Sequence, residues 1–83
     1  MYYVYILKSK KDHSLYIGYS TDLKKRIKSH NFGQNKATKY KRPYELLYAE
    51  IYKNEQDAKG REIFLKSGAG WRFIRKQLKH TLE

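Results

Sequence analysis

Two short apolar segments near the N-terminus constrain the fold more than any other feature of the chain. Residues 2–8, YYVYILK, alternate and are rich in Tyr, Val and Ile, and residues 15–19, LYIGY, resemble them. The polar residues KKDHS lie between the two segments. This pattern predicts two strands joined in a β-hairpin over residues 2–19.

The register of this hairpin decides which side chains share a face of the sheet. Paired residues of antiparallel strands have a constant sum of residue numbers. Placing Tyr5 opposite Tyr16 centres the turn on Lys10 and Lys11. We therefore expect the phenols of Tyr5 and Tyr16 to lie on the same face.

A first helix is predicted to follow the hairpin. Ser20 or Thr21 can cap this helix, and Asp22 is well placed in its first turn. The helical pattern continues to about His30. A basic loop, NFGQNKATKYKRPY, follows and contains the only proline of the chain.

The second half of the chain predicts one strand and two helices. Residues 45–53 favour a third strand. Asn54 and Asp57 resemble a capping box that opens a helix to about Ser67. The segment SGAG is expected to end that helix, and residues 71–80 to form a short basic one. The predicted fold class is α/β in the α+β sense, a three-stranded antiparallel sheet flanked by helices in the order ββαβαα.

The charge of the chain indicates its partner. Nineteen Lys and Arg residues against eight Asp and Glu residues give a net charge of +11 over 83 residues. Such an excess favours a polyanion, most often nucleic acid, over a basic surface that only maintains solubility. Nine tyrosines add rings that can stack on bases. The length predicts a single domain over residues 1–83.

Composition also excludes several classes of protein. The chain has no cysteine, so it has neither disulfides nor a thiolate metal site. Its longest apolar run, residues 2–7, is far too short to span a membrane. No basic region precedes an apolar core at the N-terminus, so no signal peptide is expected. We expect a cytoplasmic protein with no membrane partner.

Polar side chains occupy part of the first helix that should face the sheet. At about 100° per residue, one stripe of this helix carries Leu23, Arg26, Ile27 and His30. Two interpretations remain open at this point. Arg26 and His30 either extend from the edge of the stripe and bond locally, or they build a site.

A carboxylate raises the same question in the second helix. Glu62 falls between Ala58 and Leu65 on the apolar stripe. A carboxylate that faces a core is costly unless it is paired or binds a metal ion. The alternatives are a salt bridge to a basic residue of the first helix or loop, and a metal site. For Glu50, in the third strand, we expect a structural role.

One arrangement explains these polar positions together. The five side chains can converge on a phosphate group: Tyr5, Tyr16, Arg26, His30 and Glu62. Arginine binds phosphate oxygens with two parallel hydrogen bonds. A single glutamate can hold Mg²⁺, which takes its other ligands from water and substrate phosphate.

The same residues carry a resemblance to a known family. The motif YVY, ten further residues, and then YIG are followed by TDLKKRIKSHN, KYKRP and REIFLKSG. In this order and spacing, the chain resembles the GIY-YIG endonuclease family, and its small stand-alone members in particular. The first motif has Tyr3 and Val4 in place of Gly and Ile.

The resemblance implies roles for the candidate residues. Tyr5 matches the tyrosine near the scissile phosphate, and Tyr16 the proposed general base on water. Arg26 matches the arginine that contacts the phosphate, and His30 a position that is His or Tyr in the family. Glu62 matches the single metal-ligating glutamate, so one Mg²⁺ or Mn²⁺ ion is implied, bound firmly only with substrate.

The resemblance also implies binding positions around this site. Gly18 matches the motif glycine, where a side chain would block the approach of the backbone. Tyr19 stands where excision-repair relatives carry a lysine, so one phosphate contact is missing there. The expected nucleic-acid-binding residues are Tyr19, Lys36, Lys39, Lys41 and Arg42.

The sequence thus predicts a metal-dependent DNA endonuclease that hydrolyses a phosphodiester bond in repair or processing. RNA is left open as a substrate. Most characterised nucleases of the family carry a second domain that provides specificity, and we expect a protein partner to provide it here. Two alternatives remain: a non-catalytic basic module that binds nucleic acid, and a subunit of a larger nuclease assembly.

Overall fold

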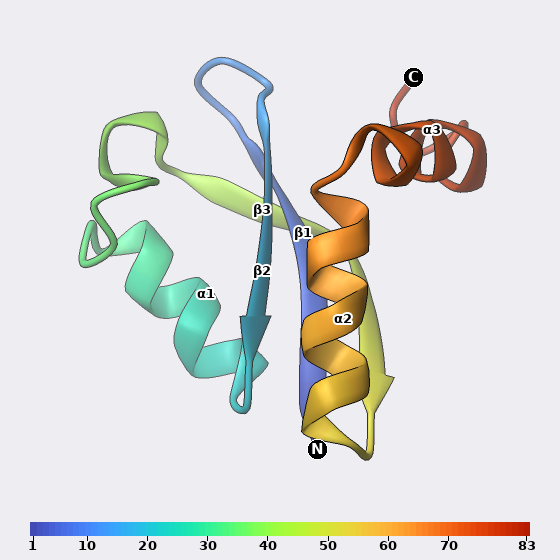
Figure 1. The fold of residues 1–83 in the computed structure, drawn as a ribbon. Coiled ribbons are helices and arrows are strands. Elements are labelled where there is room, and N and C mark those ends of the chain that lie inside the picture. Colours follow the sequence, from blue (N-terminus) through green and yellow to red (C-terminus); the bar gives the residue numbers. More distant parts are fainter.

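The computed structural model describes residues 1–83 and confirms the predicted order of elements. The strands are β1 (Tyr2–Ser9), β2 (Leu15–Ser20) and β3 (Tyr44–Tyr52), and the helices are α1 (Leu23–Asn31), α2 (Glu55–Leu65) and α3 (Gly68–Gln77). A single turn of 3₁₀ helix, η1 (Lys39–Lys41), precedes β3. The strands form one antiparallel sheet in the order β2-β1-β3, so β1 is central and β2 and β3 are its edges (Figure 1).

The predicted register of the hairpin was wrong by two residues. Tyr5 lies opposite Gly18, and Tyr16 lies opposite Leu7. The cause is the turn, where the Ser9 hydroxyl accepts hydrogen bonds from the backbone N–H groups of Lys11 and Asp12 and moves the centre of the turn along the chain. A shift by two residues keeps every side chain on its face. Tyr5 and Tyr16 therefore still share a face, as predicted.

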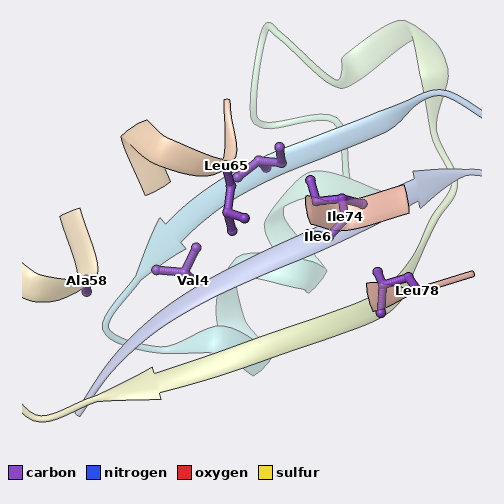
Figure 2. Close-up of a cluster of buried hydrophobic side chains, with 7 residues drawn as sticks. Val4, Ile6, Ala58, Leu65, Ile74 and Leu78 are labelled. Carbon is purple, nitrogen blue, oxygen red and sulfur yellow. The ribbon is translucent and has the colours of Figure 1, made fainter. Parts of the chain in front are cut away.

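The helices cover opposite faces of the sheet. In Figure 1, α1 lies on one side of the strands and α2 with α3 on the other. The core between the sheet, α2 and α3 consists of Val4, Ile6, Ile17, Ala58, Leu65, Ile74 and Leu78 (Figure 2). The other face carries a smaller apolar cluster, which consists of Tyr5, Leu7 and Tyr44. The candidate tyrosines therefore lie under α1, away from the main core.

The start of α1 differs from the prediction. Asp22, and not Ser20 or Thr21, is the N-cap, and its carboxylate accepts a hydrogen bond from the N–H of Lys25. Ser20 is buried and its hydroxyl bonds to the backbone of Asp22, which orients the cap. At the other end, the Asn31 side chain bonds to both the N–H and the carbonyl of Tyr44. Polar contacts thus fix both ends of α1.

Helix α2 begins as predicted, but the segment after it is helical. Asn54 caps α2 and accepts hydrogen bonds from two backbone N–H groups. The SGAG segment was expected to be a break and the last helix to cover residues 71–80. Instead Ser67 caps α3, which runs from Gly68 to Gln77. A Cβ on Gly70 would lie 2.0 Å from the carbonyl oxygen of Phe64, so this glycine lets α3 start against the end of α2.

None of the helices combines the length and the apolar composition that a membrane crossing requires.

Two of the helical glycines, Gly60 and Gly70, predict opposite effects on stability. Gly70→Ala should lower the free energy of unfolding by about 1–3 kcal/mol, since the new methyl group overlaps backbone atoms that cannot rotate away. Gly60→Ala is the matched control, because a Cβ there meets nothing within 4 Å. It should raise the free energy of unfolding by about 0.5–1 kcal/mol through helix propensity. Urea denaturation measures both, and equal effects would contradict the close packing at Gly70.

Candidate active site

The side chain of Tyr5 extends over the neighbouring edge strand, β2. It projects from β1, only 1% of its surface is exposed, and its ring lies over Gly18 of β2. A Cβ on Gly18 would lie 2.3 Å from the Tyr5 hydroxyl oxygen. The motif glycine therefore makes room for the phenol of Tyr5.

A buried chain of hydrogen bonds begins at this phenol. The Tyr5 hydroxyl lies 3.0 Å from Nε2 of His30, and Nδ1 of His30 lies 2.7 Å from Oγ1 of Thr38. His30 and Thr38 are both fully buried. Sequence reasoning found Tyr5 and His30 but missed Thr38, because a threonine inside a basic loop carries no pattern that indicates burial.

Burial sets the protonation of this chain. It lowers the pKa of His30, and the nearby Arg26 lowers it further, so the imidazole is neutral at neutral pH. Burial raises the pKa of the Tyr5 phenol well above its ordinary value. Tyr16 and Glu62 raise the pKa of Tyr5 further, whereas Arg26 lowers it. All three therefore lie close enough to Tyr5 to act on its charge.

Tyr16 lies beside the same histidine. Its ring centroid is 4.9 Å from that of His30 and 6.5 Å from that of Tyr5, with the Tyr16 and His30 rings edge to face. Tyr16 is half-buried, so solvent reaches this residue, unlike Tyr5. The structure thus places the two candidate phenols and His30 side by side under α1.

Arg26 was predicted on the stripe of the first helix that faces the sheet, but its side chain is exposed and does not pack on the sheet. It lines a polar hollow of about 510 Å³ whose other lining residues are Ser20, Thr21, Asp22, Lys25 and Ser29. The hydroxyl groups and two cations of this hollow suit the oxygens of a phosphate, whereas the carboxylate of Asp22 adds a negative charge to its lining.

Glu62 lies on the opposite side of the sheet from α1 (Figure 1). It lies on α2, its side chain is 22% exposed, and it forms an ion pair of 3.1 Å with Lys66, one turn further along the helix. Glu62 is thus paired with a basic residue, as the salt-bridge alternative expected, but the partner lies on α2 and not on the first helix or the loop. Burial is the main cause of the raised pKa values of Tyr5 and Tyr19, and the negative charge of Glu62 adds to both to a smaller extent.

The residues around Glu62 limit the kind of metal ion that fits. No group of three His, Cys, Asp or Glu side chains that could hold a metal ion occurs in residues 1–83. Mg²⁺ needs no such group, because it is often held by one or two carboxylates with water and substrate phosphate as the remaining ligands. A partly exposed Glu62 therefore fits Mg²⁺ or Mn²⁺ bound together with substrate.

Glu50 is fully paired within the fold. Its carboxylate bonds to the guanidinium of Arg61 at 2.9 and 3.0 Å and to the hydroxyls of Tyr48 and Tyr52. These hydrogen bonds lower the pKa of Glu50, although burial opposes them. The contacts account for Glu50 as a structural residue.

Tyr19 lies on the other face of the hairpin from the two candidate phenols. Its ring stacks on Tyr2, and its hydroxyl donates a hydrogen bond of 2.7 Å to Glu55. Burial and Glu55 raise the pKa of Tyr19 to about 12. A contact of Tyr19 with nucleic acid stays a prediction.

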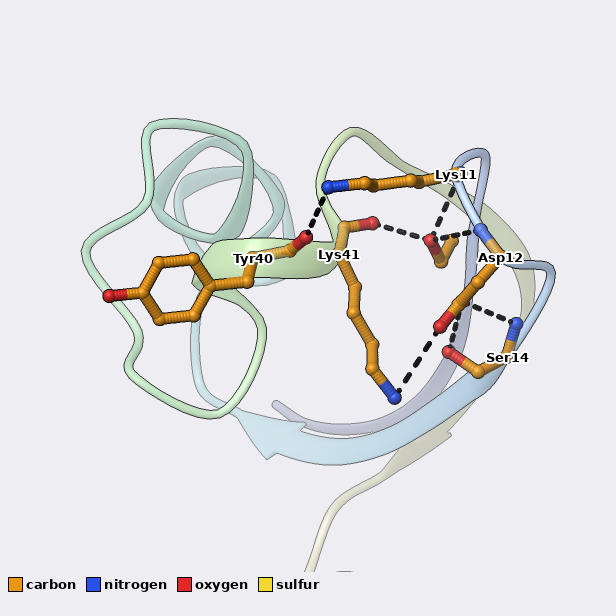
Figure 3. A network of polar contacts seen from close by, with 6 residues as sticks. Lys11, Asp12, Ser14, Tyr40 and Lys41 are labelled. Carbon is orange, nitrogen blue, oxygen red and sulfur yellow. Dashed lines mark hydrogen bonds and ion pairs between the residues drawn. The ribbon is translucent and has the colours of Figure 1, made fainter.

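The basic loop is fastened to the turn of the hairpin. Lys41 pairs with Asp12 at 3.5 Å, and the Ser9 hydroxyl donates to the Lys41 carbonyl. The amine of Lys11 donates to the Tyr40 carbonyl (Figure 3). The four predicted basic residues of this loop, Lys36, Lys39, Lys41 and Arg42, are all exposed. The loop is thus a basic surface on a fixed backbone.

Comparison with known proteins identifies the family. Residues 1–70 match the GIY-YIG catalytic domain. The chain belongs to the GIY-YIG family. All five candidate catalytic and metal-binding residues lie inside the matched range.

Several GIY-YIG relatives are small proteins like this one. The chain is 48% identical over 67 residues to the UPF0213 protein CPE1444 of Clostridium perfringens, which covers 80% of this chain and 71% of that protein. It is 42% identical over 66 residues to the UPF0213 protein YazA of Bacillus subtilis, and the match covers 78% of this chain and 66% of YazA.

A solved structure supports the fold. The solution NMR structure of the UPF0213 protein BH0048 from Bacillus halodurans matches with a TM-score of 0.57 and 35% identity, over 93% of this chain and 85% of that one. The GIY-YIG domain points to a nuclease family that acts on DNA. The roles of individual residues in this chain stay predictions.

The buried histidine of this GIY-YIG domain predicts a pH-dependent stability. Because the pKa of His30 is lower in the folded protein than its ordinary value of 6.5, the unfolded chain takes up the proton first. Stability present above about pH 6.5 should be lost as the pH falls below it, with a slope of up to about 1.4 kcal/mol per pH unit from this group. Urea denaturation from pH 7.5 to 5 measures the slope.

His30→Gln should flatten this dependence, since the titrating group is gone. His80→Gln is the control, because it removes an exposed histidine by the same substitution. An unaltered slope in His30→Gln would show that other groups cause the acid sensitivity.

Proposed function

We propose that this protein is a metal-dependent endonuclease that hydrolyses a phosphodiester bond in DNA, in repair or processing. One observation carries the proposal: Tyr5 and His30 form a buried hydrogen bond, with Tyr16 against the same imidazole. Arg26, one turn before His30, lines a polar hollow. The chain belongs to the GIY-YIG family, and hydrolysis of a phosphodiester bond is the reaction that best fits this group of side chains.

The environments of the two phenols divide their roles. Burial keeps Tyr5 protonated, and its hydroxyl bonds to neutral His30, so Tyr5 acts by positioning His30 and the neighbouring Tyr16. Tyr16 is open to solvent and accepts the proton of the attacking water. Only the phenolate form of this side chain can accept that proton. Arg26 neutralises charge on the non-bridging oxygens of the phosphate.

Glu62 would hold the divalent ion in this scheme. When bound, Mg²⁺ or Mn²⁺ supplies positive charge that stabilises the transferring phosphate and the leaving oxygen. Glu62 must leave its ion pair with Lys66 to serve as a ligand. Ion pairs four residues apart on a helix contribute only about 0.3–0.5 kcal/mol when exposed, and Lys66 is about half exposed, so it can give up this contact.

The basic loop supplies the binding surface. Its four cations lie in the segment that contains Thr38, which bonds to His30, so binding and chemistry meet in one region. A DNA strand held there places its phosphates near Tyr5. The cytoplasmic location, and a protein partner that provides specificity, belong to the same proposal.

Cleavage assays test the proposed chemistry. Glu62→Gln should abolish Mg²⁺-dependent cleavage of a panel of branched, nicked, single-stranded and duplex DNAs, because the substitution keeps the shape and removes the charge. Its unfolding free energy should change by no more than about 0.5 kcal/mol. Tyr16→Phe should slow cleavage by about 10²–10⁴-fold, the usual contribution of a general base, and leave DNA binding intact.

Tyr3→Phe is the matched control for the phenol, since it removes a hydroxyl from the same hairpin and should be nearly silent. Full activity in Glu62→Gln, or equal losses in Tyr16→Phe and Tyr3→Phe, would refute the assignment. If the wild-type protein binds the panel and cuts nothing with either metal ion, the non-catalytic binding module becomes the better function.

Salt dependence tests the binding surface. Removing one phosphate contact with Lys36→Glu should weaken binding to all sequences alike and reduce the slope of log K against log salt by about 0.7–0.9. Lys79→Glu makes the same change in net charge at an exposed position outside the loop. Fluorescence anisotropy at several salt concentrations measures both. Equal slopes in the two variants would mean that the loop makes no defined phosphate contact.

A further inference from the structure

The basic loop displays an aromatic ring that the proposed chemistry does not use. Tyr40 is 76% exposed, although tyrosine is more often half-buried. Phe32, at the start of the same segment, is 74% exposed. A single exposed aromatic residue is common and needs no function. Three further observations set Tyr40 apart from that ordinary case.

The first observation is the charge around the ring. Residues 32–44 contain four Lys and Arg residues and no acidic residue. The amine of Lys39 lies 5.5 Å from the centroid of the Tyr40 ring, over one of its faces. A ring with a cation on one side and basic residues along the chain matches the composition of sites that bind single-stranded nucleic acid.

The second observation is the set of polar contacts that hold the backbone on both sides of the ring. Tyr40 is the middle residue of η1, and the amine of Lys11 donates a hydrogen bond of 3.3 Å to its carbonyl. The neighbouring Lys41 is tied to Ser9 and Asp12. In Figure 3 the ring points away from the turn of the hairpin. Because the backbone is fixed, a ligand that stacks on this ring orders little besides the side chain.

The third observation connects the ring to the candidate active site. Thr38, two residues before Tyr40, bonds to His30, which bonds to Tyr5. The Cα atoms of Thr38 and Tyr40 can be no more than about 7.6 Å apart, since each step along the chain is about 3.8 Å. The ring therefore belongs to the same short loop segment as Thr38, and this shared segment links it to the candidate site.

We propose that Tyr40 is a stacking platform for an unpaired nucleobase, and that the protein acts on strands with unpaired nucleotides beside the scissile phosphate. This inference rests on the proposed function for its reaction, but the stacking itself does not require cleavage. Bases inside a duplex already stack on their neighbours, so only an unpaired base can lie on the ring. The basic loop holds the adjoining phosphates, and Tyr40 adds a preference for single strands.

Binding measured without metal ions tests the platform. Full-length protein is titrated in EDTA against a fluorescein-labelled single-stranded thymidine oligonucleotide and against a blunt duplex. Tyr40→Ala should weaken single-strand binding by about 5- to 150-fold, the range for loss of one stacked base, and leave duplex binding nearly unchanged. The salt dependence should stay the same, because no phosphate contact is lost.

Two further variants separate stacking from simple apolar contact. Tyr40→Trp should keep or tighten single-strand binding, whereas Tyr40→Leu should behave like Tyr40→Ala. Ile63→Ala, at an exposed apolar position on α2, is the control and should bind like the wild type. The proposal is overturned if Tyr40→Ala loses nothing, if it loses single strand and duplex equally, or if Tyr40→Leu binds as well as Tyr40→Trp.

These outcomes are independent of catalysis. A protein that fails to cut any DNA in Mg²⁺ but loses single-strand binding in Tyr40→Ala would refute the endonuclease and leave the platform standing. Cleavage by the wild-type protein, with no effect of Tyr40→Ala on single-strand binding, would support the endonuclease and refute the stacking platform.

Discussion

The hydrogen bond between the Tyr5 hydroxyl and His30 is the interaction on which the arrangement around α1 depends. It joins the central strand to α1 in a place that water does not reach. On one side the Tyr5 ring needs Gly18 of the edge strand, and on the other side His30 needs the hydroxyl of Thr38. A buried polar group without a partner costs about 1–3 kcal/mol, so each member of the chain holds the others in place.

The two faces of the sheet are stabilised in different ways. Aliphatic side chains join α2 and α3 to the sheet and form the main core. Helix α1 contributes only Leu23 and Ile27 to its own apolar contact, and polar bonds from His30 and Asn31 fix the end of the helix. The candidate site lies on this second face, where the groups that hold the helix are also those suited to phosphate chemistry. The nonpolar face supplies the stability that this arrangement requires.

Much of the architecture could be predicted from local patterns. Alternation predicted the strands, and Asn54 predicted the start of α2, because strand pairing and helix capping depend on neighbouring residues. The register of the hairpin could not be predicted, since the Ser9 hydroxyl moved the turn. The start of α3 was also missed. Gly68 and Gly70 suggested a break, whereas the close crossing of two helices requires the small residue there.

The sequence by itself determined the family, the fold class and the group of candidate residues, because motif spacing and periodicity are properties of the chain. Only the tertiary structure decided how those residues differ. It buried Tyr5 and His30 as a bonded pair, left Arg26 exposed over a polar hollow, and brought in Thr38 from the loop. The physical reason is that burial and hydrogen-bond partners depend on what other elements place nearby, and β2, α1 and the basic loop meet only in the folded chain.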